Sequence, residues 1–105
     1  IPLSIQEKAI LLAVARGLRP DEAYIDLKDV RKAYQICCEE YDLTKIGLAQ
    51  LQGVLTELSK TGLINMKHLE GRLLVSLPEI PIEILRRELE NIIRDERSSN
   101  PQNKK

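Results

Sequence analysis

The chain of 105 residues is poor in aromatic side chains, with no Trp, no Phe and three Tyr. Its core must therefore be aliphatic, and it lacks the row of rings on which single-stranded bases stack. Its 16 basic residues balance 16 acidic ones, so the net charge is 0. Any affinity for nucleic acid must come from a local basic patch. These absences argue against an RNA or single-strand binder and weaken, without excluding, the case for a DNA binder.

Cysteine and histidine are also scarce. Cys37 and Cys38 are adjacent within a helical pattern, and His68 is the single histidine. A disulfide between neighbouring cysteines is strained, so we predict reduced core residues of an intracellular protein. The sequence has no Cys/His metal cluster, no Gly-rich phosphate loop and no nucleophilic triad. We therefore expect no metal, no cofactor and no enzymatic activity in this chain.

No apolar run approaches the roughly 18 residues of a membrane span, and no signal sequence opens the chain, which begins with Ile1. We expect a piece of a longer polypeptide, located in the cytoplasm with the nucleoid, or in the nucleus if the source is eukaryotic. Hydrophobic residues make up 43% and charged residues 30%, which suits one folded domain, predicted over 1–97. The polar segment 98–105 is predicted to be a disordered tail.

Two helical patterns open the chain. Ser4 and Glu7 predict an N-terminal capping box for the first helix, which Arg16-Gly17 should end. Asp26 is the predicted N-cap of the second helix. The apolar stripe of that helix consists of Leu27, Val30, Tyr34, Cys37 and Tyr41. Between the two helices, a short strand at 24–25 is expected to pair with a later hairpin.

The third helical pattern covers 43–61 and follows the second after a connection of only a few residues around 42–43. Its buried face is predicted to carry Leu48, Leu51, Leu55 and Leu58, with Gly62 as the stop.

Strands 63–69 and 72–77 follow, joined by a turn at Glu70-Gly71. A fourth helix should start near Pro81, with a buried stripe of Ile82, Leu85, Leu89 and Ile92 that Ile84 and Ile93 widen. This order predicts an α+β, mostly helical winged helix-turn-helix. It has three core helices, a two- to three-stranded antiparallel wing sheet and a C-terminal fourth helix.

Two exposed surfaces are candidates for binding. Opposite its leucines, the third helix presents Ala49 and Gly53, a smooth surface that either a major groove or another protein could approach closely. The alternative is a glycine tolerated on a solvated face. Lys28, Arg31 and Lys32 line the outer side of the second helix. They are either simply solvated or in contact with a DNA backbone, which the helix before a recognition helix crosses.

Three segments, 3–13, 30–37 and 55–64, resemble the C-terminal winged-helix domain of archaeal replication initiators, the homologues of origin recognition complex subunit one and cell division control protein six. The resemblance extends from residue 3 to about residue 95. It implies double-stranded origin DNA, an upstream ATPase domain of the same chain and other replication proteins as partners. It also implies DNA contacts by the third helix and the wing, where Lys67, His68 and Arg72 lie beside the turn. The predicted DNA-binding residues are Thr44, Lys45, Ala49, Gln50, Gln52, Gly53, Thr56, Lys60, Lys67, His68 and Arg72, with Lys28, Arg31 and Lys32 on the DNA backbone.

Two functions remain open. The first is a double-stranded DNA-binding module of a replication initiator, which the basic wing and the resemblance favour. The second is a winged helix used for protein–protein contacts within a replication or transcription complex, which the neutral net charge favours. For the first, few phosphate contacts and a shallow salt dependence are expected.

Overall fold

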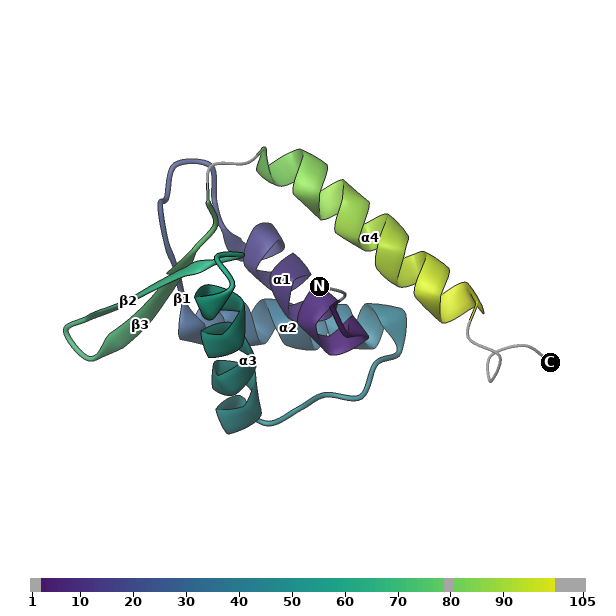
Figure 1. Ribbon diagram of the computed structural model, residues 1–105, viewed down its shortest axis with the longest axis horizontal. Helices are drawn as coiled ribbons and strands as arrows, with labels where there is room; N and C mark the ends of the chain where they lie inside the picture. Colours follow the sequence, from purple (N-terminus) through teal and green to yellow (C-terminus); the bar gives the residue numbers. More distant parts are fainter. Residues whose placement is uncertain (1–2, 79–80, 100–105) are drawn as a thin grey trace.

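The computed structural model describes residues 3–78 and 81–99. Four helices and a three-stranded antiparallel sheet of order β1-β3-β2 confirm the predicted winged helix-turn-helix (Figure 1). In chain order the elements are α1 (Ile5–Gly17), β1 (Ile25–Asp26), α2 (Leu27–Tyr41), α3 (Leu48–Lys60), β2 (Asn65–Leu69), β3 (Arg72–Ser76) and α4 (Ile82–Ser99).

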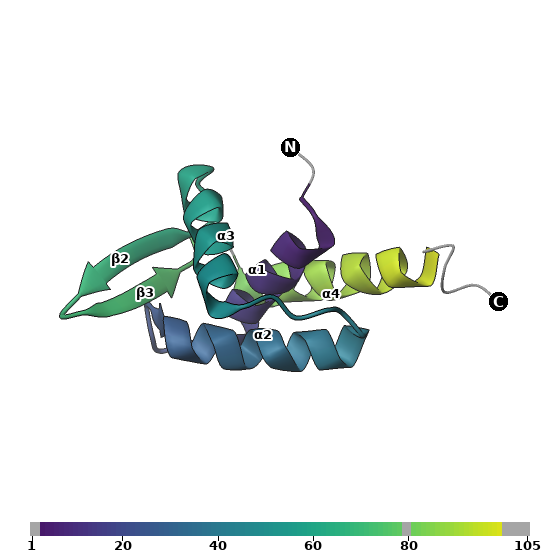
Figure 2. The same cartoon turned by 90° about the horizontal axis from the view of Figure 1, so that it is seen from below.

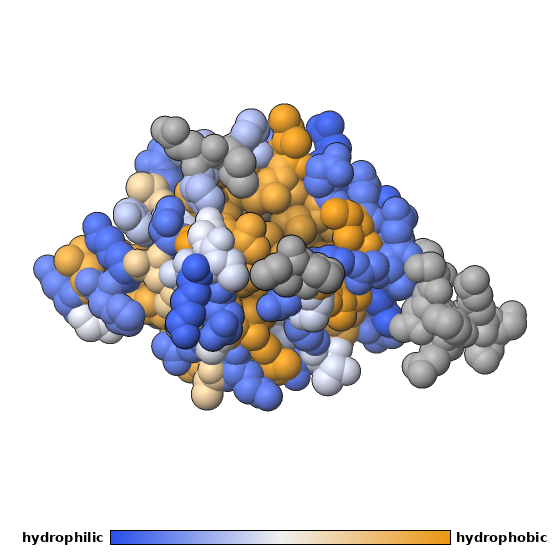
Figure 3. Space-filling model, viewed as in Figure 1, coloured by the Kyte–Doolittle hydropathy of each residue, from blue (hydrophilic) through white to orange (hydrophobic). Residues whose placement is uncertain are grey.

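Helix α1 is the central element of the fold. The Ser4 hydroxyl accepts from the Glu7 N–H at 3.1 Å, and the Glu7 carboxylate accepts from the Ser4 N–H at 2.7 Å, so the predicted capping box is confirmed. Every residue from 9 to 15 is buried, because α1 packs against α2 and α4 and also touches α3. Figure 3 shows hydrophobic residues gathered over the centre of the face on which α1 lies, with hydrophilic residues toward both ends.

Helix α2 begins at the predicted cap, where the Asp26 carboxylate accepts from the Lys28 N–H at 2.9 Å. Cys37 and Cys38 are free and buried, and burial raises the pKa of the Cys37 thiol to about 11. The helix ends at Asp42, whose φ of 56° is left-handed. The cysteines therefore serve as neutral thiols of the core.

Helix α3 is shorter than predicted. It begins at Leu48, so 42–47 is a loop rather than the end of one helix and the start of the next. Gly47 is the N-cap, and the Gln50 side chain accepts from its N–H at 3.1 Å. The N–H of Ile46 donates instead to the Tyr34 hydroxyl at 3.1 Å. The backbone before Gly47 is thus bonded to α2, and the helix begins after this contact.

The predicted buried face of α3 is confirmed at three of its four leucines. Leu51, Leu55 and Leu58 are at most 2% exposed, but Leu48 is 39% exposed. Leu48 is the first residue of the helix and extends beyond the core that the other three enter.

The wing is a hairpin with a two-residue turn. Glu70 and Gly71 have φ of 52° and 77°, the left-handed pair that matches the twist of the flanking strands. The ladder pairs Leu69 with Arg72 at the turn, and Ile25 of β1 pairs with Val75 of β3. The short strand is confirmed one residue later than predicted.

Helix α4 follows Pro81, whose carbonyl accepts from the Leu85 N–H at 3.1 Å. Ile92 is 39% exposed and Ile84 is 58% exposed, so the predicted stripe is wrong at both residues. The residues that face the core are Ile82, Leu85, Leu89 and Ile93, spaced by three, four and four. From the sequence, either Ile92 or Ile93 could be the buried residue of the stripe. The packing of α4 against α1 buries Ile93.

The helix extends to Ser99, two residues into the predicted tail. Residues 100–105 lie outside the described residues, as do residues 79–80 of the predicted break at 78–81. The boundary between domain and tail stays a prediction. Among the described residues, no helix is both long and apolar enough to cross a membrane.

Candidate nucleic-acid interface

The wing, α3 and the start of α2 lie at one end of the molecule, and the C-terminal end of α4 points the other way (Figures 1 and 2). A surface groove joins the three elements. Its lining comes from the first turns of α2 and α3 and from the wing turn: Asp26, Leu27, Lys28, Arg31, Leu48, Gly71, Arg72 and Leu73. Any rod-shaped partner that crosses this end would meet all three elements.

The loop before α3 is held by a pair of polar side chains. The Tyr34 hydroxyl donates to Gln6 Oε1 at 2.5 Å, and the Gln6 amide donates to the Thr44 carbonyl at 2.6 Å. Together with the bond from Ile46, these contacts fix both sides of the loop to α1 and α2. Burial raises the pKa of Tyr34 to about 12, so the hydroxyl keeps its proton and can donate. The direction of α3 thus depends on two residues that do not belong to it.

Thr44 and Lys45 lie in this loop rather than in α3, which corrects the prediction that they begin the recognition helix. Both side chains are exposed, because the loop runs over the surface between the two helices. Lys45 Nζ pairs with a Glu39 carboxylate oxygen at 3.2 Å. Lys45 therefore brings less positive charge to the interface than its sequence position suggests.

The outer face of α3 is polar, nearly uncharged and free of bulk. Ala49, Gln50, Gln52, Gly53 and Thr56 are all exposed, as predicted. Apart from its chain neighbours and the backbone of α3 itself, no described heavy atom lies within 4 Å of a Cβ placed on Gly53. The oxygen of Gln50 is occupied by the cap, and the hydroxyl of Thr56 donates to the Gln52 carbonyl at 2.9 Å. This face can lie close against a partner while offering few groups that discriminate between bases.

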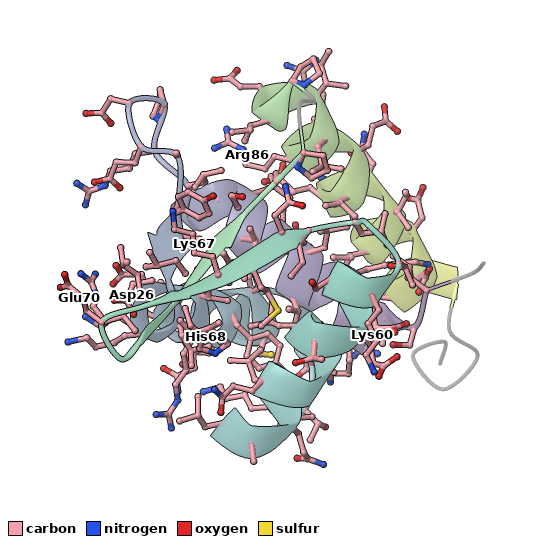
Figure 4. All side chains as sticks on the ribbon, turned by 60° about the vertical axis from the view of Figure 1, so that its left-hand side comes forward. Asp26, Lys60, Lys67, His68, Glu70 and Arg86 are labelled. Atoms are coloured by element: carbon pink, nitrogen blue, oxygen red, sulfur yellow. The ribbon has the colours of Figure 1, made fainter. Side chains whose placement is uncertain are left out.

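Lys60 is at the opposite end of α3 from the groove, beside β2, and its Nζ lies 3.5 Å from a Glu57 carboxylate oxygen (Figure 4). It is exposed as predicted but is partly neutralised.

The start of α2 carries the unpaired positive charge of this end. Lys28, Arg31 and Lys32 are exposed and form no side-chain hydrogen bond or ion pair with any residue that the structure describes. Their spacing of three and four places them on neighbouring turns of one side of the helix. Two of the three also line the groove. They are well placed to meet phosphates.

The predicted wing cluster of Lys67, His68 and Arg72 is not one cluster. Lys67 and His68 lie on opposite sides of the hairpin (Figure 4), because successive side chains of a strand alternate between faces. Lys67 Nζ lies 4.7 Å from the centre of the Tyr24 ring. His68 is on the other face, with no hydrogen bond or ion pair among the described residues.

Arg72 is held by Asp26. Its Nε donates to Asp26 Oδ2 at 2.9 Å, and its Nη2 lies 2.8 Å from the same oxygen in an ion pair. The hydrogen bond from the Lys28 N–H, and then that from Arg72, lower the pKa of the Asp26 carboxyl. Asp26 is therefore ionised at neutral pH and binds both α2 and the wing.

Comparison with protein families identifies the domain. Residues 2–77 match the family described as CDC6, C terminal winged helix domain. The chain belongs to this family. The resemblance to replication initiators is thereby confirmed, and with it the prediction of a non-catalytic module. In a comparison with curated proteins, none matches the chain.

Solved structures agree with the CDC6 assignment. The chain is similar to Cdc6p from Pyrobaculum aerophilum, with a TM-score of 0.82 and 29% identity over 90% of this chain and 24% of that one. It is also similar to the ORC2 protein of Aeropyrum pernix in its ADPNP-ADP complexes, with a TM-score of 0.77 and 26% identity over 92% of this chain and 25% of that one. The CDC6 winged-helix domain described here thus spans about a quarter of each of these proteins.

A likeness to BpsR of Bordetella bronchiseptica, described as regulated in its DNA binding by 6-hydroxynicotinic acid, shows the fold alone. Its TM-score is 0.58 and its identity 23%, over 95% of this chain and 65% of that one.

Sequence reasoning missed three residues that shape the interface of this CDC6 domain: Gln6, Tyr34 and Asp26. Asp26 was expected only as a cap and Tyr34 only as a core residue. The signal for Tyr34 was its hydroxyl on an otherwise apolar stripe, because a buried hydroxyl needs a partner. Within the described ranges, no group of three or more His, Cys, Asp or Glu could hold a metal ion.

Proposed function

We propose that this domain binds double-stranded DNA at replication origins, beside the ATPase domain of the same polypeptide. The observation that carries the proposal is the unpaired basic face of Lys28, Arg31 and Lys32, at the same end as the exposed face of α3 and the wing. Membership of the CDC6 winged-helix family supports it. Such a protein would work in the cytoplasm on the nucleoid, or in a nucleus.

Helix α2 and helix α3 would make different kinds of contact with DNA. The α2 cations would bind phosphates, which positions a protein on DNA without reading its sequence. The smooth face around Ala49 and Gly53 would enter the major groove, where Gln52 could bond a base edge. Because the amide oxygen of Gln50 and the hydroxyl proton of Thr56 are already engaged, base readout should be weak. The domain would rely on backbone contacts and on shape.

Nucleotide chemistry would belong to the rest of the parent protein. The Aeropyrum pernix ORC2 protein was solved in ADPNP-ADP complexes, and this chain matches 25% of its length. We place the corresponding ATPase module outside this chain. No cofactor is proposed for the domain itself.

Protein docking is a second candidate, and α4 is the observation that favours it. Ile84 and Ile92 are 58% and 39% exposed, and their separation of eight residues places them on one side of the helix. Helix α4 itself extends away from α3 and the wing (Figure 1). Docking through α4 and DNA binding through α3 are therefore compatible in one molecule.

The test is titration of the ¹⁵N-labelled domain with a short duplex, followed by NMR and fluorescence anisotropy. Shifts should concentrate at the starts of α2 and α3 and in the wing. The triple variant Lys28→Gln/Arg31→Gln/Lys32→Gln should bind about tenfold more weakly, because it removes phosphate contacts.

The matched control is Arg86→Gln/Arg87→Gln/Arg94→Gln. It removes the same charge from exposed positions of α4, on the other side of the molecule, and should change affinity little. Equal losses in the two variants would show that net charge alone drives binding. No shifts in the unsubstituted domain at low salt would leave protein docking as the better candidate.

A further inference from the structure

We propose that Asp26 is a positioning residue for DNA binding, which holds the wing in register with α3 through its ion pair with Arg72. The inference rests on the proposed function and extends it to a residue that does not itself contact DNA. It begins with how the wing is attached to the helices.

The backbone attachment of the wing is slight. Among the described residues, β1 pairs with β3 at two positions only, Ile25 with Val75 and Asp26 with Leu74. Arg72 lies two residues nearer the turn than Leu74, beyond the end of that ladder. From there its Nε donates to Asp26 Oδ2 at 2.9 Å, and its Nη2 lies 2.8 Å from the same oxygen. This side-chain pair therefore continues the attachment where the backbone pairing stops.

Asp26 is a fixed anchor for that pair. Its Oδ1 accepts from the Lys28 N–H at 2.9 Å, so one oxygen caps α2 and the other binds the wing. The Asp26 side chain is 22% exposed, against 64% for Arg72. A long arginine side chain bound to a short, capped aspartate takes its position from the first turn of α2. The wing is thereby tied to the turn that carries the first phosphate-binding candidate.

A second contact acts on the same face of the wing. Lys67 is directly opposite Leu74 in the ladder, and its ammonium lies over the ring of Tyr24, just before β1. Both wing cations of this face thus reach back to residues 24–26. A partner that spans α3 and the wing would meet two elements already fixed relative to each other, and less ordering would be needed on binding.

The proposal predicts that loss of the Asp26 carboxylate weakens DNA binding, whereas electrostatics alone predicts stronger binding. The two can therefore be distinguished by experiment. Removing a carboxylate beside the α2 cations should strengthen DNA binding if charge is all that matters. Asp26→Asn removes that charge and keeps the cap, since Asn caps helices as well as Asp does. Asp29→Asn removes the same charge from the same first turn, at an exposed residue without an ion pair to Arg72.

The experiment compares duplex affinity by anisotropy for the two variants, with circular dichroism to show that both are folded. Asp26→Asn should weaken binding about threefold, within the range of an exposed ion pair, and Asp29→Asn should not weaken it. In an Arg72→Gln background, Asp26→Asn should have no further effect. Arg72→Lys keeps the charge but loses the guanidinium that places both Nε and Nη2 against Asp26 Oδ2, so its duplex affinity should also fall. Unchanged or tighter binding by Asp26→Asn would overturn the proposal.

A second readout needs no DNA. In ¹⁵N relaxation, the amides of 67–72 should become more mobile in Asp26→Asn and stay as rigid as the unsubstituted protein in Asp29→Asn. An equally rigid wing in both variants refutes the proposal. Failure of the unsubstituted domain to bind duplex would refute the DNA-binding function instead, so the two failures are distinguishable.

Discussion

Tyr34 shows how a single hydroxyl can place a helix. It donates to Gln6 of α1 and accepts from the N–H of Ile46, the residue before the α3 cap. Tyr34→Phe keeps the ring in the core and leaves both partners without their bonds. We expect a loss of about 1 kcal/mol in the free energy of unfolding, as for other half-buried hydrogen bonds. Urea denaturation measures it.

The control for this substitution is Tyr24→Phe. Tyr24 is half-buried and, among the described residues, its hydroxyl makes no hydrogen bond. The ring that lies under Lys67 is preserved in Phe. Stability should be unchanged there. If Tyr34→Phe were as stable as the control, the loop before α3 would be held by packing rather than by the hydroxyl.

Substitution of Gly53 should change stability and DNA binding in opposite directions. A mid-helix glycine costs about 1 kcal/mol relative to alanine, and a Cβ at Gly53 would meet no described atom within 4 Å beyond its chain neighbours and the α3 backbone. Gly53→Ala should therefore raise the free energy of unfolding by about that amount. If α3 lies against the floor of a groove, the same variant should bind duplex more weakly; unchanged affinity would contradict close approach. Gly62→Ala, at a φ of 83°, should destabilise the domain instead.

At the scale of elements, Arg16 of α1 joins α1, α2 and α4 to one another. It donates to Glu40 of α2 at 2.7 Å and to Glu90 of α4 at 3.0 Å. Burial disfavours its charged form, yet the hydrogen bonds to the two carboxylates raise the pKa of Arg16 above its ordinary value. The hydrogen bond from Arg16 in turn lowers the pKa of Glu40.

The lowered pKa of Glu40 fixes the sign of a pH effect. Its contribution to stability is fully present above the ordinary value of 4.5 and is lost as pH falls through the lowered folded value. Glu40→Gln should therefore lower Tm at pH 7 and converge toward the unsubstituted protein below about pH 4.5. The Glu40 side chain is 47% exposed, so the effect should stay under about 1 kcal/mol. Thermal denaturation from pH 3 to pH 7 measures it.

Glu88→Gln is the comparison variant, because Glu88 is exposed on α4 and forms no ion pair with the described residues. Its Tm difference from the unsubstituted protein should not vary with pH. A constant difference for Glu40→Gln as well would show that Arg16 does not bind Glu40 in solution.

Elements were predictable from sequence where local rules decide them. The capping box at Ser4, the cap at Asp26 and the turn at Glu70-Gly71 depend on neighbours a few residues away, and all three are confirmed. The start of α3 depends on a bond from Ile46 to a residue of another helix, and helical periodicity cannot show that. The prediction was least accurate at the site. Strand alternation places Lys67 and His68 on opposite faces of the hairpin, and Arg72 is bound by Asp26, which is distant in the sequence.

At the scale of the whole molecule, pairing of charges decides how strongly the domain can attract DNA. The chain has no net charge. Several cations of α3, of the loop before it and of the wing already have anionic or aromatic partners: Lys45, Lys60, Lys67 and Arg72. On the α2 face, three cations have no partner among the described residues: Lys28, Arg31 and Lys32. The field at this end is therefore local and short in range.

This charge distribution predicts a shallow salt dependence. Each phosphate neutralised on duplex DNA contributes about −0.9 to the slope of log K against log salt, so three contacts give a slope of about −3. Anisotropy titrations between 50 and 200 mM salt, roughly the range over which such slopes are linear, would measure it. The α2 triple variant should bring the slope close to zero, because the cations of α3, of the loop before it and of the wing already have partners: Lys45, Lys60, Lys67 and Arg72. A slope steeper than about −6 in the unsubstituted domain would mean that DNA breaks the ion pairs of Arg72 and Lys45 and recruits them to phosphates.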